Sequence, residues 1–187
     1  MGYESLGSFA RSRAPVPVDI TEIPNGLAGT EAIISKMAEC ALSAYSDERV
    51  NQLARQVTIR CPSHDHLCEA RTIAAWFHSN FRYTLLPIAK GGLQRLHTAG
   101  YTLFDAPART GECASLSVAM AAMAMSLGIR TGFRTAGPDI LSPDTFVHVY
   151  VVFDIPGYGI AVADPSYYAE LDREHEDAVV KRDWWIT

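Results

Sequence analysis

The sequence lacks several features that would assign it quickly to a class of protein. Its 187 residues contain no apolar run of the roughly 18 residues that a membrane-spanning helix needs. The N-terminal stretch MGYESLGSFARSRAPVPVD has no apolar core of signal-peptide length. Basic residues are few, since 16 Lys and Arg stand against 21 Asp and Glu, whereas nucleic-acid-binding domains usually carry the opposite excess. We therefore expect no membrane or nucleic acid as partner, and a cytoplasmic location without signal-peptide export.

Cysteine is scarce as well, with four residues at positions 40, 61, 68 and 113. In a chain of this length without an export signal, we expect reduced thiols; a Cys61–Cys68 disulfide would need an oxidising setting. The run CPSHDHLC at 61–68 offers four soft ligands, but its spacing matches no usual zinc finger. We therefore expect no metal site, and nothing in the sequence implies an organic cofactor.

The composition is that of a globular protein, with 48% hydrophobic and 20% charged residues. Prolines at 15, 17 and 24, followed by Asn25-Gly26, predict an extended N-terminal arm over 1–25. We expect one folded domain over 26–169. The remaining residues, 170–187, read as a charged tail.

Within that tail, the charge run from Glu170 to Asp183 predicts a solvated helix face. Trp184 and Trp185 leave two alternatives open. They form a patch for a protein partner, because Trp is enriched at interfaces, or one of them packs back onto the sheet.

Hydrophobic periodicity predicts an α+β fold, with N-terminal helices and a central helix packed on an antiparallel sheet. The segment from Cys113 to Leu127 has no charge and is apolar on nearly all sides, which is typical of a buried helix. The segment FVHVYVVF, rich in β-branched and aromatic residues, predicts a central strand. The expected helices span about 30–45, 46–57, 65–79 and 113–127, and the expected strands 129–135, 146–153 and 160–163.

Three residues in this framework suit nucleophilic catalysis by a thiol. Cys113 opens the buried helix, whose amide dipoles favour a thiolate. His148 lies in the central strand as a candidate base and acid, and Asp164 ends the next strand as a carboxylate that orients the imidazole. Gly111 would let the backbone approach a substrate closely. Taken singly, each residue has an ordinary reading as a buried thiol, a core histidine or a turn residue.

The motifs resemble those of the transglutaminase-like branch of the papain-like cysteine enzymes. RTGECASLSVAMAAMAMSLG is similar to the Gly-Asp-Cys helix of that family, FVHVYVVF to its His strand and AVADPSY to its Asp-Pro-Ser/Thr strand end. Upstream, ARTIAAWFHSNFRYTLLP resembles the helix that leads into an Arg-Tyr-Thr segment. The resemblance implies a papain-like fold, a Cys113–His148–Asp164 triad and a likeness to the compact versions of bacteria and tailed phages.

Two details of the site depart from this pattern or stay open. Glu112 stands where the family usually has Asp. The backbone N–H of Cys113 is the first candidate to stabilise an oxyanion, and a second donor comes from Gln94 or Tyr83.

The sequence thus predicts a cysteine enzyme that attacks an amide or peptide carbonyl of a protein or peptide substrate. Hydrolysis of the thioester gives a protease or amidase, and capture by an amine gives crosslinking; the sequence leaves both open. The alternative is a structural or assembly protein of a phage particle that uses the same scaffold without catalysis. In that alternative the N-terminal arm and the two tryptophans make the contacts, and the protein is located in the phage particle instead of the cytoplasm.

Overall fold

A computed structural model describes residues 22–84 and 96–187 of the chain. Most of the predicted N-terminal arm, and the candidate oxyanion donor Gln94, lie outside the described residues.

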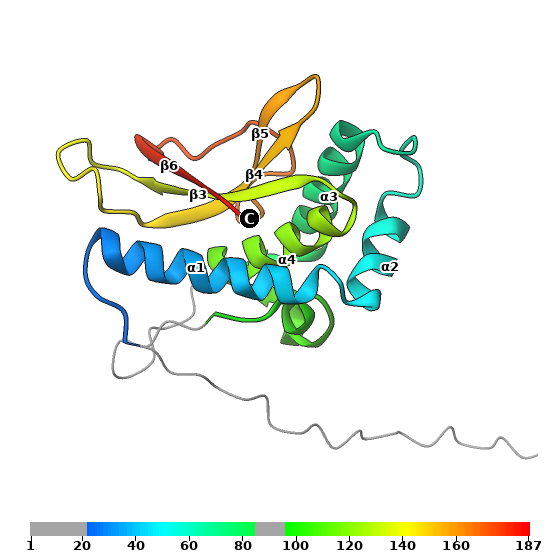
Figure 1. Ribbon diagram of the computed structural model, residues 1–187, viewed down its shortest axis with the longest axis horizontal. Coiled ribbons are helices and arrows are strands. Elements are labelled where there is room, and N and C mark those ends of the chain that lie inside the picture. The colour runs from blue at the N-terminus through cyan, green and yellow to red at the C-terminus, as the bar shows by residue number, and fades with distance from the viewer. Residues whose placement is uncertain (1–21, 85–95) are drawn as a thin grey trace, which may run out of the picture.

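Helices pack on one face of a four-stranded antiparallel sheet whose strand order is β5-β4-β3-β6 (Figure 1). This arrangement confirms the predicted α+β fold. The four long helices and three of the four strands of this sheet lie within a few residues of their predicted bounds, whereas the last strand was not predicted. The helices are α1 (Leu27–Ala44), α2 (Glu48–Val57), α3 (His66–Asn80) and α4 (Cys113–Ser126). The sheet strands are β3 (Arg130–Gly137), β4 (His148–Ile155), β5 (Gly159–Ala163) and β6 (Val180–Trp185). Two short strands, β1 (Arg82–Tyr83) and β2 (Thr110–Gly111), pair in parallel beside the start of α4.

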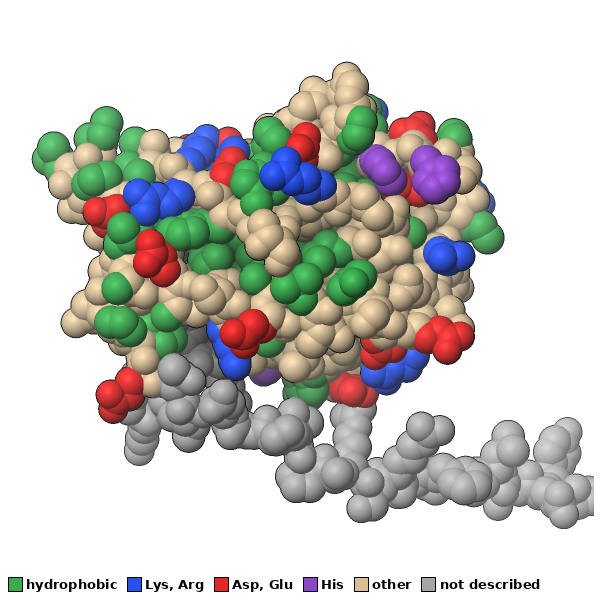
Figure 2. Space-filling view, viewed as in Figure 1, with side chains coloured by type: hydrophobic (Ala, Val, Ile, Leu, Met, Phe, Trp, Pro, Cys, Tyr) green, Lys and Arg blue, Asp and Glu red, His purple; other side chains and the backbone are tan. Residues whose placement is uncertain are grey.

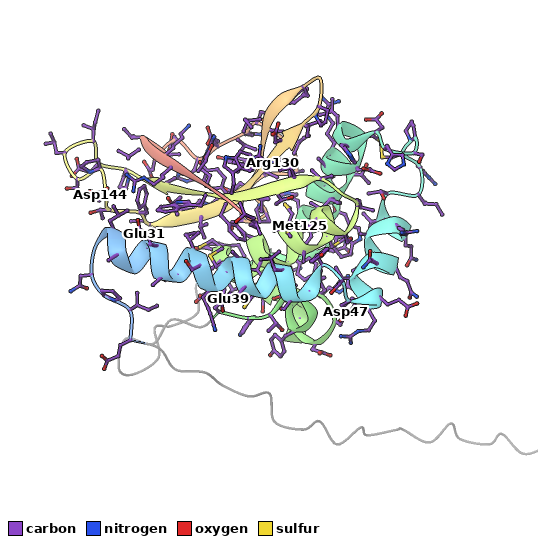
Figure 3. All side chains as sticks on the ribbon, in the orientation of Figure 1. Glu31, Glu39, Asp47, Met125, Arg130 and Asp144 are labelled. Atoms are coloured by element: carbon purple, nitrogen blue, oxygen red, sulfur yellow. A yellow bond between two sulfur atoms is a disulfide. The ribbon has the colours of Figure 1, made fainter. Side chains whose placement is uncertain are left out.

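Helix α4 lies at the centre of the molecule, and this buried position explains why its sequence has no charged residue. Every residue from Ala114 to Ala124 is buried, and α4 contacts the other three helices as well as β3 and β4. Small residues such as Ala119, Ala121 and Ala122 let these neighbours approach closely, because a larger side chain would hold them apart. Charged side chains are kept at the surface: Glu31 and Glu39 of α1, both labelled in Figure 3, are exposed. On the face drawn in Figure 2, acidic and basic side chains are interspersed.

The connection from β5 to β6 crosses the face of the sheet opposite the helices, because these strands are at opposite edges. Two carboxylates hold this crossover, residues 164–179. Asp172 accepts a hydrogen bond from the backbone N–H of Val162 at 2.8 Å. Glu174 accepts one from the hydroxyl of Tyr150 at 2.6 Å and pairs with Arg134 at 3.1 Å. Burial and the bond to Glu174 raise the pKa of Tyr150 above its ordinary value, so its hydroxyl stays protonated and the crossover is tied down.

The prediction of a solvated helix face over 170–183 is wrong, and the folded body extends past the expected boundary at 169. Residues 180–185 form β6, which pairs antiparallel with β3. Charged side chains of β6 form ion pairs across the sheet: Asp183 binds Arg134 on the neighbouring strand at 2.5 Å. A run of alternating charge fits a strand as well as a helix when cross-strand partners exist, and those partners are distant in sequence.

The two tryptophans lie in β6 with their side chains on opposite faces, as successive residues of a strand do. Trp184 packs against the core on the helix side, and its indole N–H donates to Thr135 at 2.9 Å. Trp185 packs on the other face, under the guanidinium of Arg130 at 4.6 Å. Both are half-buried, so they do not form a single patch of adjacent exposed indoles.

The expectation that all cysteines are reduced is also wrong, because Cys61 and Cys68 form a disulfide with a Cα–Cα distance of 5.6 Å. The capping of α3 brings them together: Asp65 accepts a hydrogen bond from the N–H of Cys68 at 3.0 Å, and the preceding loop folds back. Two of the four soft ligands in that run are therefore bonded to each other. No helix in the described ranges combines the length and the hydropathy of a membrane span.

We predict that the double change Cys61→Ser and Cys68→Ser lowers the free energy of unfolding by about 2 kcal/mol, because a closed loop of this short length restricts the unfolded chain only modestly. Urea unfolding under non-reducing conditions measures the change, with Cys40→Ala as the matched control. Reduction of the wild type should reproduce the shift. A thiol titration that finds four free cysteines in the native protein would contradict the disulfide.

Candidate active site

His148 and Asp164 come together through the pairing of β4 with β5. The register pairs Val151 with Ala163. Extending it by one residue sets Asp164 opposite Tyr150, so that His148 is its diagonal neighbour, within reach of a long side chain. The side chains meet, with Nε2 of His148 2.8 Å from Oδ2 of Asp164.

The carboxylate of Asp164 is buried, with 1% of the residue exposed. Burying a carboxylate is costly unless its oxygens are satisfied. Oδ2 binds the imidazole of His148, and Oδ1 accepts the backbone N–H of Ser166 at 3.0 Å. Both oxygens are therefore used, and the orientation of the carboxylate is fixed from two sides.

Cys113 lies at the first position of α4, where the backbone N–H groups of the first turn have no partner within the helix. The chain reaches it through β2, which runs parallel to β1 and pairs Tyr83 with Gly111. A Cβ atom at Gly111 would lie 2.9 Å from Cδ2 of Leu116. Glycine therefore leaves room here for the side chain of Leu116 at the start of α4.

The environment of His148 favours its charged form. Burial opposes the imidazolium, but hydrogen bonding to Asp164 and to Cys113, with the charges of both, outweighs it and raises the pKa of His148 to about 9. Since Nε2 is bound to Asp164, Nδ1 is the ring nitrogen left to face another group. The structure thus brings together Cys113, His148 and Asp164, from α4, β4 and the end of β5.

Two tyrosines complete the surroundings of the imidazole. Burial, the charge of Cys113 and the proximity of Tyr167 raise the pKa of Tyr83 well above its ordinary value. The ring of Tyr167 lies 5.3 Å from the ring of Tyr83 and 5.3 Å from that of His148. The predicted site residue Tyr83 therefore belongs to this cluster, whereas Gln94 lies outside the described residues.

Sequence reasoning missed Tyr167. It follows Asp164 in the string DPSYY, and a turn directly after the candidate carboxylate was a signal available in the sequence. The turn returns the chain over the imidazole: the N–H groups of Tyr167 and Tyr168 both donate to the backbone carbonyl of Asp164, at 3.4 and 3.1 Å.

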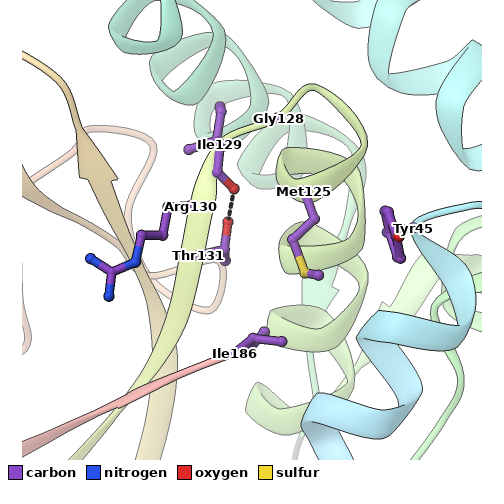
Figure 4. A pocket seen from close by; sticks show the side chains of 7 residues that line it. All are labelled: Tyr45, Met125, Gly128, Ile129, Arg130, Thr131 and Ile186. Carbon is purple, nitrogen blue, oxygen red and sulfur yellow. Dashed lines mark hydrogen bonds between the residues drawn. The ribbon is translucent and has the colours of Figure 1, made fainter.

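A separate cavity of about 210 Å³ lies at the other end of α4 (Figure 4). Met125 and Ile186 project into it, and Tyr45 closes one side. Met125 is twelve residues along the helix from Cys113, about 18 Å at 1.5 Å per residue. This cavity is therefore not part of the candidate site.

A model of the transglutaminase-like superfamily matches residues 51–165, which is more than half of the chain. The match includes Cys113, His148 and Asp164. The chain belongs to the transglutaminase-like superfamily, and the resemblance inferred from its motifs is confirmed.

Two solved structures are similar to this chain. One is a proposed protease from Parabacteroides distasonis ATCC 8503, with a TM-score of 0.55 and 13% identity over 71% of this chain and 26% of that one. The other is a proposed cysteine protease from Cytophaga hutchinsonii, with a TM-score of 0.49 and 18% identity over 75% of this chain and 47% of that one. This chain thus spans about a quarter and about half of those proteins. At such identities the first likeness supports the fold alone. A search of curated proteins found no match.

We predict that Asp164→Asn lowers the pKa of His148 from about 9, because the hydrogen bond to Asp164 is the largest influence that raises it. NMR titration of the imidazole measures the shift. Asp154→Asn is the matched control, since Asp154 lies on the same strand but pairs with Arg130 at 2.6 Å.

The same pair links folding to pH. A folded-state pKa above the ordinary value of about 6.5 means that folding favours the protonated ring. The stability from this pair is therefore complete below pH 6.5 and lost as the pH rises through about 9. An unchanged His148 titration in Asp164→Asn would contradict both statements.

Proposed function

We propose that this protein is a cysteine enzyme that cleaves an amide or peptide bond through a thioester on Cys113. The observation that carries the proposal is the hydrogen bond of 2.8 Å between His148 and the buried carboxylate of Asp164, with Cys113 beside the same imidazole at a helix N-terminus. Membership of the transglutaminase-like superfamily supports the same chemistry.

In the first half of the reaction, the sulfur of Cys113 attacks the carbonyl carbon of the substrate. An imidazolium beside the sulfur favours the thiolate, and so does the positive end of the α4 dipole. The C–S bond forms while the carbonyl electron pair moves onto oxygen. As this oxyanion collapses, the C–N bond breaks and His148 gives its proton to the leaving amine.

In the second half, neutral His148 takes a proton from water, which attacks the thioester and releases the carboxylic acid and the thiolate. An amine in place of water gives a new amide by the same steps. Asp164 keeps the imidazole in one orientation throughout and stabilises its positive charge, without itself taking the proton.

The oxyanion needs donors held in place before the reaction begins. The backbone N–H of Cys113 is one, at the start of α4 where helix N–H groups have no partner within the helix. The hydroxyl of Tyr83 is the second, since its raised pKa keeps it protonated and it lies within electrostatic reach of Cys113. The name of the first similar structure, a proposed protease, agrees with an amide substrate.

Alkylation by iodoacetamide at neutral pH, followed by peptide mapping, tests the proposal. We expect Cys113 to react at least about tenfold faster than Cys40, because burial raises the pKa of the Cys40 thiol, while an activated thiol reacts as its thiolate. Cys61 and Cys68 should not react without a reductant, because they are joined.

His148→Ala should slow the labelling of Cys113 at least about tenfold, since it removes the adjacent positive charge and base. His78→Ala, an exposed change at the end of α3, is the matched control. Equal labelling of Cys113 and Cys40 in the wild type would overturn the proposal and leave the scaffold alternative. A fluorescent amine added with a peptide substrate shows whether water or an amine accepts the acyl group. Incorporation of the amine into the substrate indicates crosslinking, and a new carboxylate on the substrate indicates hydrolysis.

A further inference from the structure

Ser117 lies one turn beyond Cys113 in α4 and makes a hydrogen bond that leaves the helix. It is fully buried, and its hydroxyl donates to the backbone carbonyl of Val149 on β4 at 3.2 Å. Serine hydroxyls within helices often bond back to a carbonyl of their own helix, as those of Ser126 in α4 and Ser79 in α3 do. The hydrogen bond of Ser117 is instead a directed contact between α4 and the sheet.

The pairing of β4 with β5 explains why the carbonyl of Val149 needs a donor. Both backbone groups of Val162 on β5 bind Asp172 of the crossover at 2.8 Å, so they point away from β4. Because these groups alternate in direction along an antiparallel strand, those of Ala163 point toward β4 and so do those two residues further on. The register, extended by two residues from Ala163, sets Pro165 opposite Val149. Proline has no N–H, so β5 supplies no donor at this position.

The hydroxyl of Ser117 takes the place of that missing N–H. Val149 is buried, and a buried carbonyl without a donor is costly. An alanine at position 117 would occupy nearly the same space with a better helix propensity, as alanines do elsewhere along α4. It would leave the carbonyl of Val149 without this donor, so the hydrogen bond, and not packing, explains the serine.

This hydrogen bond lies between the elements that carry the three site residues. Ser117 is four residues after Cys113, so both side chains lie on one face of α4. Val149 directly follows His148 in β4, and the proline opposite it directly follows Asp164. Apolar contacts between α4 and the sheet have no preferred direction, whereas a hydrogen bond requires both a length and an alignment. The contact therefore restricts where the start of α4 lies relative to β4.

A small displacement of α4 would matter, because the attraction between a thiolate and an imidazolium falls as their distance grows. We propose that Ser117 is a positioning residue for the proposed reaction: its hydroxyl holds the first turn of α4 against β4 and so keeps the sulfur of Cys113 beside the imidazole of His148. This inference rests on the proposed function. It predicts that loss of the hydroxyl weakens the ion pair, so that the thiolate forms only at a higher pH.

The rate of alkylation by iodoacetamide as a function of pH measures this ion pair. The C–S bond forms as iodide leaves, and the thiolate is the reacting species, so the rate follows the fraction of thiolate. A neighbouring imidazolium moves the acid limb of the profile below the ordinary thiol pKa of about 8.5. Peptide mapping follows the labelling of Cys113 separately from that of Cys40.

We expect Ser117→Ala to raise the midpoint of the acid limb by about one pH unit, a tenfold loss of thiolate at low pH, as loss of about one hydrogen bond would do. At alkaline pH the thiolate forms without the imidazolium, so labelling there should stay within about twofold of the wild type. A merely structural role would lower the stability without moving the midpoint.

Ser115→Ala is the matched control. Ser115 is also buried in α4 and also binds a backbone group outside the helix, since its hydroxyl accepts the N–H of His97 at 3.1 Å. That bond joins α4 to the segment before residue 100 and not to the sheet. Both variants should lose similar stability in urea unfolding, but the midpoint of the acid limb should be unchanged in Ser115→Ala.

An acid limb in Ser117→Ala at the wild-type midpoint would overturn the inference. Equal shifts in the two serine variants would overturn it as well, because loss of any buried hydroxyl in α4 would then suffice. Failure of the proposed function looks different, since the wild type itself would then show its acid limb near the ordinary thiol pKa of about 8.5.

Discussion

The buried carboxylate of Asp164 is the group on which the arrangement of the site depends. A carboxylate with 1% exposure is tolerated only where each oxygen has a partner. Here the partners are the imidazole of His148 and the turn that follows β5. The carboxylate of Asp164 therefore holds the imidazole on one side and the start of the crossover on the other. The hydrogen bond from His148 to Asp164 is also the main reason that the imidazole favours its positive form.

Helix α4 makes the complementary contribution by bringing the sulfur to this pair. Its burial on all sides fixes the helix between three other helices and two strands. The first residue of such a helix cannot shift without repacking the core. The position of Cys113 is thus fixed by buried alanine and methionine residues of α4 that lie far from the reacting sulfur. Strands β1 and β2 supply the backbone next to it.

Much of this could be predicted from the sequence, because the decisive signals are local. The uncharged run over 113–127 predicts α4. The order of Cys113, His148 and Asp164, each within a motif that resembles the family's, predicts the site. The rest depends on partners that are distant along the chain. Strand β6 was missed because Arg134, which binds Asp183 at 2.5 Å, is far from it in sequence. The Cys61–Cys68 bond was missed because the expected chemistry of thiols depends on the cellular setting, which composition does not reveal.

Strand β6 also has a consequence for how the protein can be divided. It covers the outer edge of β3 with a ladder that runs from Gly132 to Gly137. A fragment cut at 169, where composition suggests a border, would leave that edge with unsatisfied N–H and C=O groups along its length. Such an edge is a template for strands of other molecules. The shortened protein would then tend to associate with itself, although every residue of the candidate site would still be present.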